Sequence, residues 1–100
     1  MQLNRPKFVE EREVRLPCEI SAELNTGELI IDIQAGGDQS YGALIRPELV
    51  NRESSPATIP ARVVAEWNGD LLVDLPIDTL IAGSRIRVRK DIVVEKSAMR

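Results

Sequence analysis

The stretch VRLPCEISAELNTGELIIDI, residues 14–33, predicts a β-hairpin and decides the fold class. Apolar side chains recur at every second position from Val14 to Leu24, with charged or polar side chains largely between them. This period of two is typical of a strand that buries one face. Asn25-Thr26-Gly27 has the composition of a tight turn, and the apolar run that follows completes the hairpin.

A second stretch, IPARVVAEWNGDLLVDL at residues 59–75, resembles residues 16–33 once a one-residue gap is placed at Thr26. Turn chemistry alone accounts for a shared Asn and Gly, so two unrelated hairpins are one interpretation. Shared Pro, Glu and Asp residues favour a duplicated unit of three strands, with residues 42–46 aligning more loosely with residues 83–87. The identical pairs are Pro17/Pro60, Ala22/Ala65, Glu23/Glu66, Asn25/Asn68, Gly27/Gly69, Leu29/Leu71 and Asp32/Asp74.

The predicted fold is all-β: a small six-stranded barrel or sandwich built from two three-strand repeats related by a pseudo-twofold axis. A chain of 100 residues forms one domain. Three strands cannot bury an apolar face alone, whereas two such units can close around a shared interior. The predicted divisions are a flexible charged N-terminal arm (1–13), a single β domain (14–96) and a tail (97–100). Within the domain we expect repeat 1 at about 14–50, a linker at 51–58 and repeat 2 at about 59–95.

Aliphatic residues must form the core, because the chain has only three aromatic residues. The predicted core consists of the inward positions of the expected strands: Val14, Leu16, Cys18, Ile20, Leu24, Leu29, Ile31, Ile33, Leu44, Val63, Trp67, Leu71, Val73, Leu75, Ile86, Val88, Ile92 and Val93.

The composition excludes several kinds of site. The chain has no histidine, which removes Ser-His-Asp and Cys-His catalysis and imidazole metal ligands. Its one cysteine, Cys18, cannot form an intrachain disulfide and is expected to be a small buried hydrophobe. We therefore expect no catalytic residue, no metal site and no cofactor.

The distribution of charge and apolar residues bears on location. No apolar run reaches the roughly 20 residues that a membrane-spanning helix needs. Residues 1–13 are polar and lack the apolar segment of a signal peptide. These features predict a cytoplasmic protein without membrane contact. The formal net charge of −3 argues against bulk binding to nucleic acid.

One basic cluster, Arg85, Arg87, Arg89 and Lys90, could form a phosphate-binding strip, because alternation puts the three arginines on one strand face. No aromatic residues accompany it to stack bases. The favoured alternative is a solvated outer face whose charges are balanced by Asp and Glu on neighbouring strands.

Asp32 and Asp74 are equivalent in the repeat, and a paired arrangement of their carboxylates could perform acid–base chemistry. The stretch around Asp32 is faintly similar to the active-site strand of retroviral-type aspartic proteases, which implies an aspartate-dyad hydrolase. Ile33 and Gln34 stand where that family has a hydroxyl residue and Gly. The favoured alternative is that both carboxylates face solvent or pair with Arg46 and Arg87 across the sheet.

Residues 12–15 (REVR) and 32–37 (DIQAGG) resemble the opening of PilZ domains, compact β-barrels that bind cyclic di-GMP. The signature of that family is Arg-x-x-x-Arg followed further along by Asp/Asn-x-Ser-x-x-Gly. The resemblance implies ligand binding by Arg12, Arg15, Asp32 and Gly37. The arginine spacing is one residue short, and Gln34 replaces the family's Ser.

Taken together, the sequence favours a non-catalytic binding or assembly module whose partner is another protein or a second copy of the chain. The usual catalytic constellations are missing, and the chain is too short to enclose a large pocket beside its own core. Two alternatives stay open: a degenerate PilZ-like sensor related to cyclic di-GMP, and an aspartate-dyad hydrolase.

Overall fold

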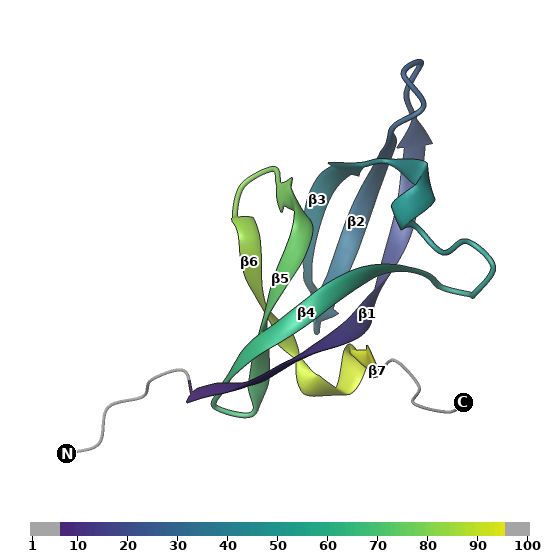
Figure 1. The fold of residues 1–100 in the computed structure, drawn as a ribbon. Helices are drawn as coiled ribbons and strands as arrows, with labels where there is room; N and C mark the ends of the chain where they lie inside the picture. The colour runs from purple at the N-terminus through teal and green to yellow at the C-terminus, as the bar shows by residue number, and fades with distance from the viewer. Residues whose placement is uncertain (1–6, 96–100) are drawn as a thin grey trace.

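The computed structural model describes residues 7–95, which are built mainly from β-strands (Figure 1). The predicted all-β class is confirmed, and the barrel closes with five strands instead of the predicted six, with two further strands paired outside it. In chain order the elements are β1 (Lys7–Glu23), β2 (Leu29–Gly36), β3 (Gln39–Ile45), the 3-10 turn η1 (Pro47–Leu49), β4 (Ala57–Trp67), β5 (Asp70–Thr79), β6 (Gly83–Arg89), the 3-10 turn η2 (Lys90–Ile92) and β7 (Val94–Glu95).

Five strands close into a barrel in the order β1-β2-β3-β5-β4, with β4 pairing back to β1. Every pairing is antiparallel, as expected for hairpins joined by tight turns. β6 pairs with β5 outside this ring, and the short β7 pairs with β1. In Figure 1, β6 lies on the left of β5, while β4 and β1 cross the lower front of the barrel.

The two halves of the chain pair their strands in equivalent ways. The β1–β4 ladder pairs Leu16 with Ile59, which are aligned in the sequence comparison. The β1–β2 ladder shifts its register after Ile20, and the β4–β5 ladder shifts after Val63, again at aligned positions. The two hairpins therefore have register shifts at matching positions on either side of the Leu16–Ile59 pair.

The third strands follow the same relation, but in a different register from the loose alignment of Gly42 with Gly83. The β2–β3 ladder pairs Asp32 with Gly42, and the β5–β6 ladder pairs Asp74 with Arg85. Gly42 therefore corresponds to Arg85, two residues further along than the alignment placed it. Cross-strand pairing sets this register, and the sequence of the third strands is too dissimilar to show it.

The outer strands of the two halves, β3 and β6, meet the other half at two seams. At the closed seam, β3 meets β5: Ala43 pairs with Thr79, and the Leu80 N–H donates to the Gly42 carbonyl at 2.8 Å. At the open seam, β6 lies beside β2, and no backbone pairing between them occurs in residues 7–95. The aliphatic stem of Arg89 lies against Gly36 there instead, so that a Cβ on Gly36 would come within 2.7 Å of the Arg89 Cβ.

The barrel interior contains most of the predicted core. The predicted positions that are buried are Val14, Leu16, Cys18, Leu29, Ile31, Ile33, Val63, Leu71, Val73, Leu75, Ile86 and Val88. Ile20, Trp67, Ile92 and Val93 are only partly buried. The unexpected buried residues are the hydrophobic Ala35, Ala43, Ile45, Val50, Ile59, Ala61, Val64 and Ala65 and the polar Thr58 and Thr79.

Two core predictions are wrong. Leu24 is 37% exposed because β1 ends at Glu23 and Leu24 belongs to the turn. Leu44 is 38% exposed because β3 turns Ala43 and Ile45 inward, which leaves Leu44 on the outer face.

The predicted divisions at the chain ends shift. Residues 7–13, expected in a flexible arm, form the first part of β1, where Lys7 and Phe8 pair with Glu66 and Ala65 of β4. Of the expected linker, residues 51–56 are an exposed connection, whereas 57 and 58 begin β4. Residues 1–6 of the arm and the expected tail at 97–100 lie outside the described residues.

Candidate functional site

The four PilZ-like positions engage different partners. Arg12 donates from Nε and Nη2 to the Glu95 carboxylate, both at 3.1 Å. Through these hydrogen bonds Arg12 holds the pKa of Glu95 below its usual range. Arg15 donates to Thr58, from Nε to Oγ1 at 2.8 Å and from Nη2 to the carbonyl oxygen at 3.1 Å.

The other two positions lie elsewhere on the barrel. Asp32 on β2 accepts a hydrogen bond from the Ser21 hydroxyl at 3.1 Å. Gly37 lies in the β2–β3 turn, next to the guanidinium of Arg89. No hydrogen bond or ion pair within residues 7–95 joins any two of the four positions. Cyclic di-GMP binding at these residues stays a prediction.

Each member of the basic cluster has an acidic neighbour. Arg85 binds Asp74 through two hydrogen bonds, at 2.6 and 3.0 Å. The other three contacts are Arg87 with Asp70 at 2.9 Å, Arg89 with Asp91 at 2.8 Å and Lys90 with Glu66 at 3.6 Å. Arg85 lies directly opposite its partner Asp74 in the β5–β6 register. Arg87 lies opposite Leu72 and reaches Asp70 diagonally, and Arg89 binds Asp91 of η2. Every basic side chain of the cluster is therefore paired with a carboxylate.

Asp32 and Asp74 do not form a hydrogen-bonded dyad. They lie on β2 and β5, which are separated in the ring by β3. The hydrogen bonds from Arg85 hold the pKa of Asp74 below its usual range, which keeps it ionised rather than sharing a proton. The partners expected for these carboxylates, Arg46 and Arg87, are not the ones they have.

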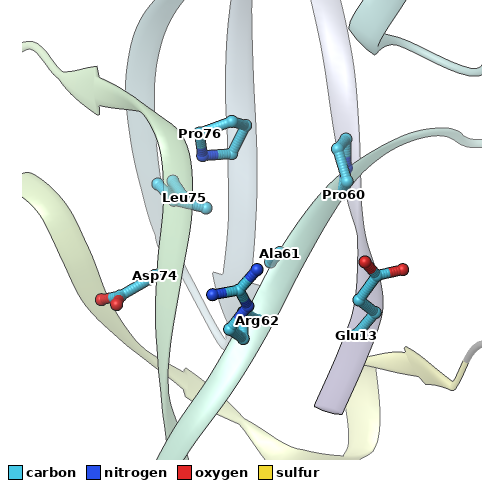
Figure 2. Close-up of a pocket in the computed structure, with 7 residues that line it drawn as sticks. All are labelled: Glu13, Pro60, Ala61, Arg62, Asp74, Leu75 and Pro76. Atoms are coloured by element: carbon cyan, nitrogen blue, oxygen red, sulfur yellow. The ribbon is translucent and has the colours of Figure 1, made fainter. Parts of the chain in front are cut away.

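A shallow cavity of about 270 Å³, which we call the fork groove, opens where β4 and β5 separate beyond the Arg62–Asp74 pair. Figure 2 shows Arg62 between Asp74 on β5 and Glu13 on β1, with the rings of Pro60 and Pro76 above. The lining also includes Ala61 and Leu75. The groove therefore combines an arginine and two carboxylates with an apolar floor.

A second cavity, the seam hollow, has a volume of about 320 Å³ and lies at the open seam. It brings the β2–β3 turn together with the basic residues of β6, two features that the sequence analysis treated separately. Sequence reasoning missed Gln39, Tyr41 and Asp70, because only the folding of β6 toward β2 brings them near the arginines. Its lining residues are Ala35, Gly36, Gln39, Tyr41, Asp70, Arg87, Val88 and Arg89.

An apolar patch lies on the outer face at the closed seam and consists of Ile30, Leu44, Leu80 and Ile81. Leu80 is 67% exposed and Ile81 is 89% exposed. Ile30 pairs with Leu44 across β2 and β3, and the Leu80 side chain lies over Gly42 of β3. A sequence signal existed for part of the patch: two consecutive large aliphatic residues between Asp78 and Gly83.

The single thiol and the remaining site types add no reactive group. Cys18 is buried, and burial raises the pKa of its thiol, which makes it unreactive. Among residues 7–95, no group of three or more Cys, Asp or Glu side chains is placed to hold a metal ion. No helix in that range has the length and apolar character to span a bilayer.

Comparisons with known proteins give no family for this chain: no family model, no curated protein and no solved structure matches it. The function of the chain must therefore be inferred from the apolar patch and the two cavities.

Proposed function

We propose that the chain is a non-catalytic protein-binding module that holds a segment of another protein on the apolar patch. The carrying observation is the exposure of Leu80 and Ile81 at 67% and 89% on a turn that is held in place. Burial of one such side chain against a partner contributes about 1.5–3 kcal/mol.

Hydrogen bonds fix the turn that presents these two residues. The Thr79 hydroxyl donates to the Gly83 carbonyl at 2.8 Å and accepts the Ala82 N–H at 2.9 Å. The Leu80 N–H donates to the Gly42 carbonyl of β3 at 2.8 Å. Because hydrogen bonds hold the turn backbone on both sides, this surface would lose little conformational entropy when a partner binds to it.

Acidic groups beside the patch indicate the chemistry of the partner. The Asp32 Oδ1 and the Leu80 Cδ1 lie 3.8 and 3.3 Å from the position that a Cβ on Gly42 would occupy. Asp78 is exposed and directly precedes Thr79, the residue that pairs with β3. A segment with aliphatic anchors and neighbouring Lys or Arg residues would complement this surface.

A second copy of the chain fits the patch less well. Stable dimers bury about 800 Å² on each partner, and four side chains form a smaller contact. Two copies would also bring together chains that each carry a net charge of −3. We keep the cytoplasm as the expected compartment, where a lone buried thiol stays reduced.

The test compares two variants in one binding assay. The wild-type protein is used to capture partners from an extract of the organism that produces it. Each captured protein is then purified, and its affinity for the wild type and for each variant is measured by calorimetric titration. L80S/I81S should weaken binding by at least about tenfold, because two aliphatic contacts are lost. The matched control is F8S, since Phe8 is 76% exposed but lies on β1, outside the patch.

Equal affinity of the purified partner for the wild type and L80S/I81S would overturn the proposal. So would light scattering that shows the wild type as a dimer and L80S/I81S as a monomer, because the occupant would then be a second copy.

A further inference from the structure

The seam hollow presents two guanidinium groups in fixed positions. Arg87 donates from Nε to Asp70 at 2.9 Å, and its guanidinium carbon lies 4.6 Å from the centre of the Trp67 ring. Arg89 donates from Nη2 to Asp91 at 2.8 Å, and its stem is held against Gly36. Both arginines come from one strand face and line one cavity.

Neutral polar groups belong to the same lining. The Gln39 side-chain amide donates to the Tyr41 hydroxyl at 3.4 Å, and both side chains belong to β3. The adjacent turn has two glycines in the left-handed region, Gly36 at φ 110° and Gly37 at φ 58°. The Arg89 stem already occupies the space beside Gly36, so Gly37 is the glycine whose backbone a ligand can approach closely. The Arg89 Nη1 lies 3.9 Å from the position that a Cβ on Gly37 would take.

The charges of the hollow favour an anion. Its lining contains Arg87 and Arg89 against one carboxylate, Asp70. Asp91, the partner of Arg89, is outside the lining and has a side chain that is 63% exposed. An exposed ion pair of this kind contributes little to stability, so an incoming dianion can replace Asp91 at small cost.

We propose that the seam hollow binds a small molecule that carries a phosphate or diphosphate group. The planar fork of Arg89 takes the phosphate oxygens, with Arg87 adding charge from the neighbouring position on β6. The Tyr41 hydroxyl and the Gln39 amide are available to a polar group beside the phosphate. The volume of about 320 Å³ suits a small ligand. This site is separate from the apolar patch and from Arg12 and Arg15.

The same position at the closed seam lacks this chemistry. The β2–β3 and β5–β6 registers make Leu44 the equivalent of Arg87. The β3–β5 backbone contact closes that seam, whereas at the open seam no backbone pairing joins β2 and β6 in the described part of the chain, residues 7–95. The proposal therefore applies to one seam only.

Titration with inorganic pyrophosphate, followed by backbone amide NMR shifts at low and at physiological salt, tests the site. We expect shifts concentrated at residues 35–41 and 87–89. R89Q should weaken binding by at least about tenfold, because a charge-assisted contact is lost. R89K keeps the charge and most of the stem against Gly36 but loses the fork, so it should weaken binding less than R89Q does.

The matched control is R85Q, because Arg85 lies on the same face of β6 but is bound to Asp74 and does not line the hollow. It should change the affinity by less than about twofold, since a distant surface charge has a weak effect at physiological salt. Thermal unfolding of each variant establishes that it is folded. Equal weakening by R85Q and R89Q, shifts spread over the whole surface, or no shift at millimolar pyrophosphate would overturn the proposal. Retained pyrophosphate binding in L80S/I81S would separate this site from the proposed protein-binding surface.

Discussion

The closed and open seams are flanked by similar ladders, β2–β3 and β5–β6, but the side chains at the two seams differ in chemistry. At both, an arginine with extended backbone precedes a 3-10 turn: Arg46 directly follows β3, and Arg89 is the last residue of β6. At the closed seam the outer face carries Leu44, and β3 meets β5 by backbone pairing. At the open seam the equivalent outer residue is Arg87, and an arginine stem fills the space beside Gly36.

The backbone pairing of the two halves is therefore independent of the chemistry of their outer side chains. The inward positions of both halves are aliphatic, because each contributes to one shared interior. The outward positions carry no such constraint, so one seam has become an apolar patch and the other a polar hollow. Mutations at matched positions can therefore show which properties the halves share.

The largest effect is expected for Leu29→Ala and Leu71→Ala, which are aligned, identical and fully buried residues of β2 and β5. Each should lower the free energy of unfolding by about 3 kcal/mol, through lost burial and a residual cavity. Urea unfolding of both variants measures it. A difference of more than about 1.5 kcal/mol between them would show that the halves do not share the core equally.

The next effect concerns the open seam. Gly36→Ala should destabilise the protein by about 2 kcal/mol or more, because it combines a strained φ with a clash against the Arg89 stem. Gly27→Ala is the matched control: Gly27 also has positive φ, but nothing lies within 4 Å of its Cβ position, so it should cost about 1 kcal/mol. If the two variants unfold at the same urea concentration, the Arg89 stem does not seal the seam.

A smaller effect distinguishes the two outward positions. Arg87→Met should cost about 1 kcal/mol, because it removes the cation–π contact with Trp67 and the ion pair with Asp70. It should also change the fluorescence of Trp67, the only tryptophan. Leu44→Met at the equivalent position should stay within about 0.5 kcal/mol, as a substitution on an exposed face. Equal costs for the two would mean that Arg87 adds nothing beyond its apolar stem.

The smallest effect is the pH dependence of the Asp74–Arg85 pair. Because the folded pKa of Asp74 is below its usual value, the pair stabilises the fold above about pH 4. This contribution is lost as the pH falls through the lowered pKa. The unfolding free energies of the wild type and Asp74→Asn should therefore converge in acid, and also in high salt at neutral pH, since both groups are largely exposed. A gap that persists at pH 2 would assign the effect to packing instead.

The alternation of residues 14–24 and the Asn-Gly turns were enough to predict the hairpins, because a strand with one buried face reports its period locally. The third strands were harder. The register of each third strand depends on its pairing with β2 or β5. The run Ala43-Leu44-Ile45 is apolar throughout, so the sequence does not show whether Leu44 or its two neighbours face the core. Residues 7–13 were expected to be an arm because they are mostly charged and lack a clear alternation of apolar residues. They form a strand because they pair with β4, which the local sequence does not indicate.

The candidate sites divide in the same way. Alternation alone placed Arg85, Arg87 and Arg89 on one face, but their acidic partners depend on how β5 and η2 lie beside β6. The seam hollow is lined by the turn at Gly36 and by β6, which lie roughly half the chain apart in the sequence. No local sequence pattern indicates that two such distant segments are neighbours. The all-β class and most of the buried positions could be predicted from the sequence, because a strand that buries one face has a local alternation of apolar and polar residues. Only the tertiary structure decided which seam closes and which outer residues meet, because those outcomes depend on contacts between distant strands.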